Sequence, residues 1–146
     1  MLFQPLVWTA ISTGKIVGVF EGVHKISDIS MYRLFGLGEL LAKNDEFGLG
    51  DKGYQGAERL LTPFKNPRGG KCTQEQKFYN YIHGTFRVNV ERTIGRIQNF
   101  GCFDHWRGRC ELAYHEPAFY VIAHMVNISL DLSPMLVSPP EVLYWE

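Results

Sequence analysis

The sequence predicts a single domain of the α/β class. Two runs rich in apolar and β-branched residues, 3–11 and 16–20, flank a turn signal and predict a β-hairpin. Thr73 and Gln76 have the spacing of a helix capping box, which predicts the start of a long helix. A second helical pattern with one apolar face covers residues 116–130. Strands in the first half and long helices in the second therefore give the expected architecture.

A helix capped by Ser27 or Asp28 is expected to run to Leu41, although Gly36 and Gly38 weaken its middle. After this helix comes a short buried strand, which ends at an acid.

The segment after that strand predicts a helical turn over residues 54–61, and an edge strand follows because Pro63 cannot donate a ladder hydrogen bond. We expect one domain over residues 1–133 and an irregular tail over residues 134–146, where three prolines oppose regular structure.

The composition excludes several classes of protein. A hydrophobic content of 45% with 21% charged residues is typical of a globular domain and excludes global disorder. The longest apolar run, 118–132, contains polar residues and is too short to span a bilayer, so no membrane association is expected. The three cysteines, Cys72, Cys102 and Cys110, form no disulfide framework, which indicates an intracellular, reducing compartment.

The charges are unevenly distributed along the chain. The formal net charge is zero, yet residues 52–109 hold eleven Lys or Arg against four Asp or Glu. A basic middle segment suits the phosphate backbone of DNA. A solvated surface balanced elsewhere in the fold explains the same counts.

The long helix carries a polar row at four-residue steps, namely His83, Arg87 and Glu91. This spacing places the three side chains on one flank of a helix. The row is either an exposed charge ladder or part of a site. Apolar residues at helical spacing predict a buried stripe beside it, consisting of Phe78, Ile82, Phe86, Val90, Ile94 and Ile97.

Asp51 and Glu91 raise the second interpretation above the first. Asp51 ends the apolar strand 47–51, and ligands in α/β sheets bind at the carboxyl ends of strands. If the helix packs across the sheet, the carboxylate of Glu91 comes within reach of Asp51. Two hard oxygen ligands suit Mg²⁺ or Mn²⁺, so the pair predicts a metal centre acting on phosphodiesters.

The motifs of this chain resemble those of a known family, the DDE superfamily endonuclease domain of Harbinger-type transposases. The resemblance covers roughly residues 3–130. It rests on an ordered series of motifs: Asp51–Gly56, Leu61–Lys65, Gln76–Asn80, Val90–Arg92 and Gly95–Ile97, with Asn127 in the closing helix.

The resemblance implies a ribonuclease-H-like fold that cuts and rejoins DNA with two divalent metal ions, in the nucleus if the host is eukaryotic. It makes Asp51 the second catalytic acid and Glu91 the third. His83 and Arg87 would support Glu91 or contact phosphate. The expected DNA contacts are Lys52, Arg87, Arg92 and Arg96. A homo-oligomer or a separate DNA-binding partner protein would complete the assembly.

One family feature is missing from this sequence. The family's first catalytic Asp lies on a first strand, which would precede the first residues here. Glu21 and Asp28 fit the end of a strand and the start of a helix, so neither replaces that acid. We therefore expect a partial fold, namely long C-terminal helices and a mixed sheet that lacks its central first strand. We also expect an incomplete metal pair and no cleavage by the isolated chain.

Two alternatives remain open. A non-catalytic DNA-binding or interaction module would use the basic middle segment and the arginines of the long helix. A small zinc module would use Cys102, His105, Cys110 and His115, whose spacing is similar to that of a zinc knuckle.

Overall fold

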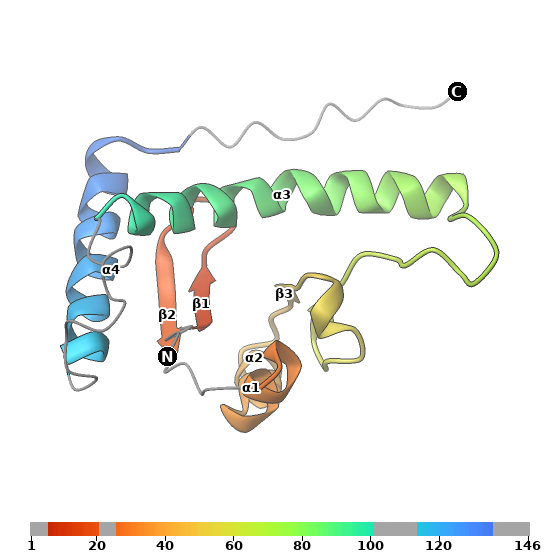
Figure 1. The fold of residues 1–146 in the computed structure, drawn as a ribbon, viewed down its shortest axis with the longest axis horizontal. Helices are drawn as coiled ribbons and strands as arrows, with labels where there is room; N and C mark the ends of the chain where they lie inside the picture. Colours follow the sequence, from red (N-terminus) through yellow and green to blue (C-terminus); the bar gives the residue numbers. More distant parts are fainter. Residues whose placement is uncertain (1–5, 21–25, 101–113, 136–146) are drawn as a thin grey trace.

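The fold is taken from a computed structural model, and the structure describes residues 6–20, 26–100 and 114–135 (Figure 1). Helices dominate these ranges, and the strands are short. In chain order the elements are β1 (Leu6–Thr9), β2 (Ile16–Phe20), α1 (Asp28–Leu34), α2 (Leu37–Lys43), β3 (Gly48–Leu49), the 3-10 turn η1 (Lys52–Tyr54), β4 (Leu60–Leu61), α3 (Gln74–Gln98) and α4 (His115–Leu132). The α/β class is confirmed.

The strands of the described residues form two separate sheets of two strands each. β1 and β2 pair antiparallel, whereas β3 and β4 pair parallel. Antiparallel and parallel pairing are both present, as expected of a mixed sheet without its central strand, but they lie in two separate sheets among the described residues. No hydrogen bond joins β1 to β3 within the part of the chain that the structure describes.

The predicted hairpin is confirmed, and it closes against α3. Its turn requires glycine at position 14, where φ is +70°. A Cβ at Gly14 would lie 3.2 Å from Thr93 Oγ1, and the Thr93 hydroxyl donates to the Gly14 carbonyl at 2.7 Å. The hairpin end is therefore held by a buried side chain of the long helix.

The helix expected from Ser27 to Leu41 is divided into α1 and α2. Ser27 caps α1, accepting from the backbone N–H of Ser30. Gly36 adopts φ of +61°, which ends one helix and begins the next. The two helices cover a core cluster that also includes residues of the hairpin and of the β3–β4 region: Leu6, Tyr32, Leu37 and Leu41, with Trp8, Tyr54 and Leu60 packed against them.

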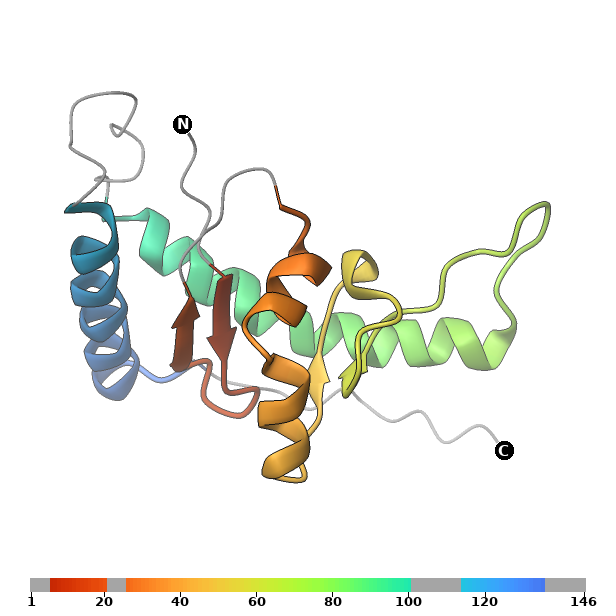
Figure 2. The ribbon, with the colours of Figure 1, turned by 90° about the horizontal axis from the view of Figure 1, so that it is seen from below.

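α3 begins at the predicted capping box and extends across the molecule (Figures 1 and 2). Thr73 Oγ1 accepts from the N–H of Gln76 at 3.2 Å, and Gln76 Oε1 accepts from the N–H of Thr73 at 3.0 Å. Of the predicted apolar stripe only Ile97 is buried, and Phe78 and Ile94 are exposed, so the stripe prediction was wrong for most of its length.

The buried face of α3 is mostly polar because it contacts turns and strand ends, whose backbone groups need hydrogen-bond partners. His83, Asn89 and Thr93 are its buried polar residues. Each contacts a backbone carbonyl: Leu61, Ile11 and Gly14, respectively. The helix thus connects both sheets through side-chain hydrogen bonds.

α4 packs across the end of α3 and forms a second core cluster with the hairpin (Figure 1). Phe119, Ile122 and Val126 lie on its buried face, together with Ile16 and Ile97 from the elements around it. None of the helices among the described residues is long and apolar enough to cross a membrane.

Asn127 attaches α4 to the hairpin and is the basis of our first prediction. Its Oδ1 accepts from the Ile16 N–H at 2.8 Å, and its Nδ2 donates to the Ile16 carbonyl at 2.9 Å. Replacing Asn127 with Ala leaves both backbone groups unpaired, so we expect the free energy of unfolding in urea to fall by about 2–4 kcal/mol. The neighbouring exposed residue provides the control: Ile128→Ala should change it by less than about 0.5 kcal/mol. Equal effects of the two substitutions would contradict this role.

Candidate active site

Asp51 lies two residues after β3, at the carboxyl end of the parallel pair. It caps the turn η1, and its Oδ1 accepts from the Gly53 N–H at 2.8 Å. This bond fixes the carboxylate relative to the strand end and leaves Oδ2 for another ligand. The predicted strand 47–51 is shorter in the structure, Gly48–Leu49, and Asp51 lies just beyond its end in the cap of the following turn.

Asp28, in the first turn of α1, lies beside Asp51. A Cβ built on Gly53 would lie 3.0 Å from Asp51 Oδ1 and 3.9 Å from Asp28 Oδ2, so both carboxylates face the same small space. Gly53 leaves that space open because it has no side chain. From the sequence we expected Asp28 only at a helix start, because no local spacing indicates contact between residues 23 positions apart.

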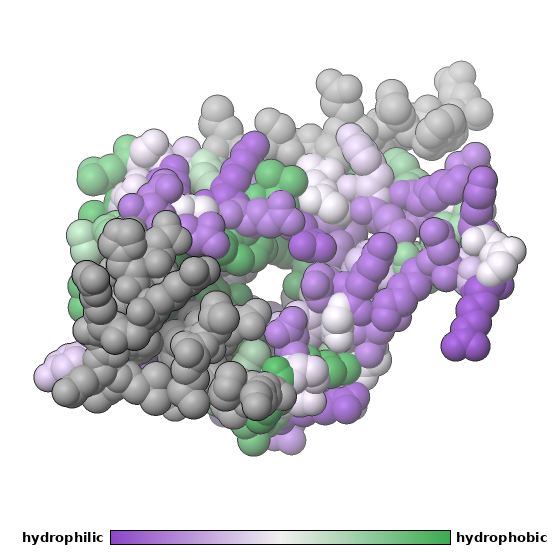
Figure 3. Space-filling view, viewed as in Figure 1, coloured by the Kyte–Doolittle hydropathy of each residue, from purple (hydrophilic) through white to green (hydrophobic). Residues whose placement is uncertain are grey.

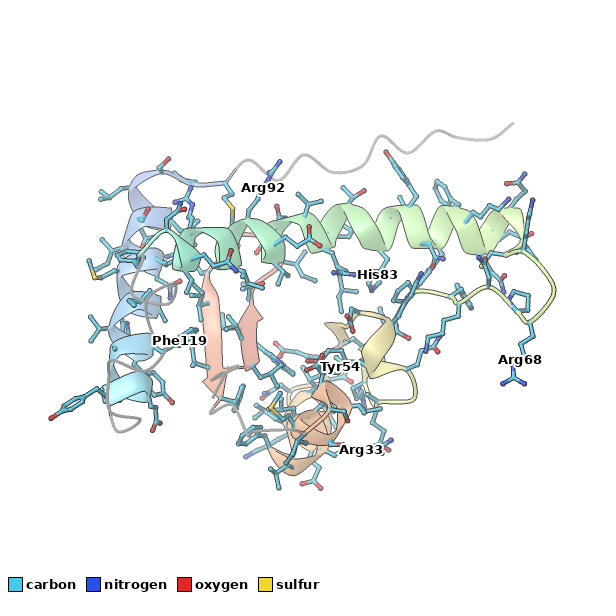
Figure 4. The ribbon with its side chains drawn as sticks, viewed as in Figure 1. Arg33, Tyr54, Arg68, His83, Arg92 and Phe119 are labelled. Atoms are coloured by element: carbon cyan, nitrogen blue, oxygen red, sulfur yellow. The ribbon has the colours of Figure 1, made fainter. Side chains whose placement is uncertain are left out.

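Tyr54 reports the electrostatic field of this acidic pair. Burial, and then the negative charges of Asp28 and Asp51, raise the pKa of the Tyr54 phenol well above its ordinary value. Its ring also contacts Tyr32 edge-on, with centroids 6.2 Å apart. Tyr54 therefore stays a neutral phenol, and its side chain packs against the core cluster around Tyr32, next to α1 and α2 (Figure 4).

His83 places α3 next to the strand that neighbours β3. Its Nε2 lies 3.0 Å from the carbonyl oxygen of Leu61, and the side chain is only 4% exposed. Leu61 pairs with Leu49, two residues before Asp51. The ring of His83 extends from α3 toward these strands (Figure 4). The imidazole thus fixes the helix near the end of β3.

Arg87 and Glu91 continue along α3 as an ion pair. Arg87 Nη2 donates to Glu91 Oε1 at 3.2 Å, and the Glu91 side chain is 62% exposed. The predicted polar row therefore divides into a buried histidine and a surface pair. Glu91 lies about 12 Å along the helix from His83, at 1.5 Å per residue. A shared cation between Asp51 and Glu91 stays a prediction, and the described residues hold no cluster of three or more potential metal ligands.

The cations expected to contact DNA lie in different places. Lys52 is exposed in the turn after Asp51, while Arg92 is exposed on α3 and extends away from the strands (Figure 4). Arg96 donates to Ser129 Oγ at 2.9 Å and to the Ser133 carbonyl at 3.2 Å, which attaches α3 to α4. A role in DNA binding stays a prediction for all of them, Arg87 included.

The candidate zinc ligands Cys102, His105 and Cys110 lie outside the described residues, and so does the side chain of His115. The expected tail, from residue 136 onward, also lies outside them. The described cysteine, Cys72, is buried, and no disulfide joins it to another described residue.

Comparison with known families identifies the region that carries this site. Residues 9–128 match the family described as DDE superfamily endonuclease, which is most of the chain. The chain belongs to this family. The match includes Asp28, Asp51 and Glu91, so the DDE endonuclease domain contains every acid discussed above.

A relative of this DDE domain is the probable transposase for insertion sequence element IS702 from Microchaete diplosiphon. It is 33% identical over 94 residues, which cover 60% of this chain and 32% of the relative. The chain thus spans about a third of the length of the curated relative that it matches. No solved structure matches the chain.

DDE superfamily endonucleases typically use divalent metal ions, and the carboxylates of this domain are suitable ligands for such ions. Asp28 and Asp51 present oxygens to one space, and carboxylate oxygens are the ligands that Mg²⁺ and Mn²⁺ prefer. Gly53 keeps that space free of side-chain atoms.

Proposed function

We propose that this DDE domain is part of a transposase that cuts DNA phosphodiester bonds with the help of Mg²⁺ or Mn²⁺. The observation that carries the proposal is the position of Asp51 at a strand end, fixed by its own turn and facing the same space as Asp28. The relative from the insertion sequence supports a DNA substrate. The Harbinger-type subfamily is also part of the proposal, supported by the order of the motifs from Asp51 to Ile97.

The proposed fold is ribonuclease-H-like, with one strand needed between β1 and β3. Such a strand would run antiparallel to β1 and parallel to β3, and it would join the two sheets into one. The sheets already share an aromatic row, since Tyr32 stacks on Trp8 and contacts Tyr54, each at a centroid distance of 6.2 Å. Figure 3 shows an open space between the α3 side and the α1–α2 side of the molecule. We propose that the first catalytic Asp is carried by a strand at this place.

In this proposal the residues of the chain hold the metal ions and orient the side chains that bind them. Asp51 and Glu91 would each offer an oxygen to the metal ions, and Arg87 would orient Glu91 through its bond to Oε1. His83 would keep α3 against the strand that neighbours β3. When bound, two divalent ions activate the attacking water and stabilise the leaving oxygen.

Metal binding tests this proposal without requiring cleavage. Titration with Mn²⁺, followed by electron paramagnetic resonance, should show weak binding to the chain, because two protein carboxylates are only part of a ligand set. Asp51→Asn should weaken this binding at least about tenfold, which is about 1.4 kcal/mol of binding free energy. Glu75→Gln removes one exposed negative charge at the start of α3 and should leave it unchanged. Equal Mn²⁺ binding by Asp51→Asn and the unmodified chain would contradict the proposed site.

A further inference from the structure

The segment between β4 and α3 forms a projecting basic loop, which we call the basic arm (Lys65–Lys71). Figures 1 and 2 show it extending beyond the strands at the end where α3 begins. Its cations are Lys65, Arg68 and Lys71, and it contains no acidic residue. In Figure 3 hydrophilic residues gather at this end of the molecule. The arm thus concentrates positive charge away from both core clusters.

The cations of the arm are exposed, and none of them pairs with a carboxylate among the described residues. The described residues form three ion pairs, which involve Lys15, Arg59 and Arg87 and none of the arm. Arg68 extends outward from the tip of the arm (Figure 4). A charge neutralised within the protein contributes little to anion binding. The cations of the arm should therefore attract phosphate more strongly than the three ion-paired cations.

The arm has a defined shape although it is exposed. At its tip the Gly70 N–H donates to the Pro67 carbonyl at 3.1 Å, and Gly69 has φ of +76°, the geometry of a type II turn. Asn66 Oδ1 accepts from the Cys72 N–H at 3.3 Å and closes the base. These bonds place Arg68 at the first central position of the turn.

Asn80 of α3 fixes the strand side of the arm. Its Oδ1 accepts from the Phe64 N–H at 2.8 Å, and its Nδ2 donates to the Phe64 carbonyl at 3.0 Å. The ring of Phe64 also packs edge-on against Tyr79, with centroids 5.1 Å apart. Preorganised cations lose less entropy on binding than mobile ones. The arm is therefore built to present charge at a fixed place relative to β4 and to Asp51 beyond it.

From these observations we infer that the basic arm binds the sugar–phosphate backbone of duplex DNA next to the candidate active site, through Lys65, Arg68 and Lys71. The inference rests on the proposed function for its DNA ligand. From Leu61 to Arg68 the chain reaches at most about 24 Å, at about 3.4 Å per residue. B-DNA presents a phosphate charge about every 1.7 Å of helix axis, so the arm would contact the duplex several base pairs away from the cleaved bond.

The test compares two triple variants of the full chain. The arm variant carries Lys65→Gln, Arg68→Gln and Lys71→Gln, and the control carries Lys15→Gln, Arg33→Gln and Lys43→Gln, three cations elsewhere that are not among the expected DNA contacts. Both lose the same charge. Affinity for a short DNA duplex of random sequence is measured by fluorescence anisotropy between about 50 and 200 mM salt, the range in which counterion release is pronounced. The unfolding midpoint of each variant shows that the fold is kept.

For the arm variant we expect the plot of log affinity against log salt to become shallower, with its negative slope reduced in magnitude by roughly 2–3, since each lost phosphate contact removes about 0.9. The control should retain most of the slope of the unmodified chain. An unchanged slope in the arm variant, or an equal loss in both variants, would overturn the inference. The same loss measured with a synthetic acidic peptide in place of DNA would also overturn it, because the arm would then select charge rather than a nucleic acid backbone.

This outcome is separable from that of the proposed function. Arm-dependent DNA binding without Asp51-dependent Mn²⁺ binding would support the arm and remove the endonuclease proposal. Asp51-dependent Mn²⁺ binding, together with DNA binding that is unchanged in the arm variant, would support the endonuclease proposal and overturn the inference about the arm.

Discussion

Joining a β-strand that ends in aspartate to the amino end of the chain is expected to produce Mg²⁺-dependent nicking of supercoiled DNA. The chain without this strand should nick at least on the order of a hundredfold more slowly, because a displacement of a reacting group by about an ångström already costs that much and the proposed metal pair would lack one ligand. The new strand would fill the place between β1 and β3, where neither edge is paired among the described residues. Gel electrophoresis of plasmid forms measures the rate.

The control for this experiment carries the same added strand with asparagine in place of its final aspartate. It should restore the paired edges of β1 and β3, and with them part of the stability, but not the nicking. Equal nicking by the chain with and without the added strand would contradict the account, and it would indicate that Asp28 supplies the third carboxylate from α1.

The second large effect concerns the acids of the chain with the added strand. Asp51→Asn and Glu91→Gln should each lower the nicking rate by roughly a hundredfold or more, since each removes a ligand of the metal pair. Asp28→Asn should lower it by less than about tenfold, or about 1.4 kcal/mol, if its carboxylate acts only through the field around Asp51. Single-turnover rates at saturating Mg²⁺ separate the loss of chemistry from the loss of metal affinity.

The opposite ranking of the Asp28 and Glu91 variants would assign the metal site to different residues. A large loss with Asp28→Asn and a small loss with Glu91→Gln would place the metal between α1 and β3. Glu91 would then be a surface residue paired with Arg87, as its 62% exposure permits.

Elements with strong local signals could be predicted from the sequence. The hairpin follows from the turn before Lys15, and the start of α3 follows from Thr73 and Gln76, whose reciprocal bonds depend only on residues three apart. The division of the first helix was only partly visible. Gly36 weakened the prediction of a continuous helix. Its left-handed backbone could not be predicted, because glycine adopts positive and negative φ about equally readily.

Burial along α3 could not be predicted from the spacing of its apolar residues. A helical stripe indicates which residues share a face, but what that face meets depends on the tertiary structure. Here it meets backbone groups of turns and strand ends, so His83 and Thr93 are buried and Phe78 is exposed.

The candidate site was also predictable only in part, because local patterns are visible in the sequence and tertiary contacts are not. The strand-end position of Asp51 depends on a local pattern, so the sequence indicated it. The approach of Asp28 depends on how α1 packs against η1, which no short-range spacing encodes. The identity of its neighbour therefore came only from the structure.

Iron-directed cleavage can show whether Asp51 and Glu91 bind the same divalent metal centre, as we propose. Fe²⁺ bound in place of Mg²⁺, with ascorbate and peroxide, generates hydroxyl radicals that cut the polypeptide near the metal, and mass spectrometry locates the cuts. The account predicts cuts near Asp51 and near Glu91 in the same sample, both lost on addition of excess Mg²⁺ and in Asp51→Asn. Cuts near Asp28 and Asp51 with none near Glu91 would contradict it.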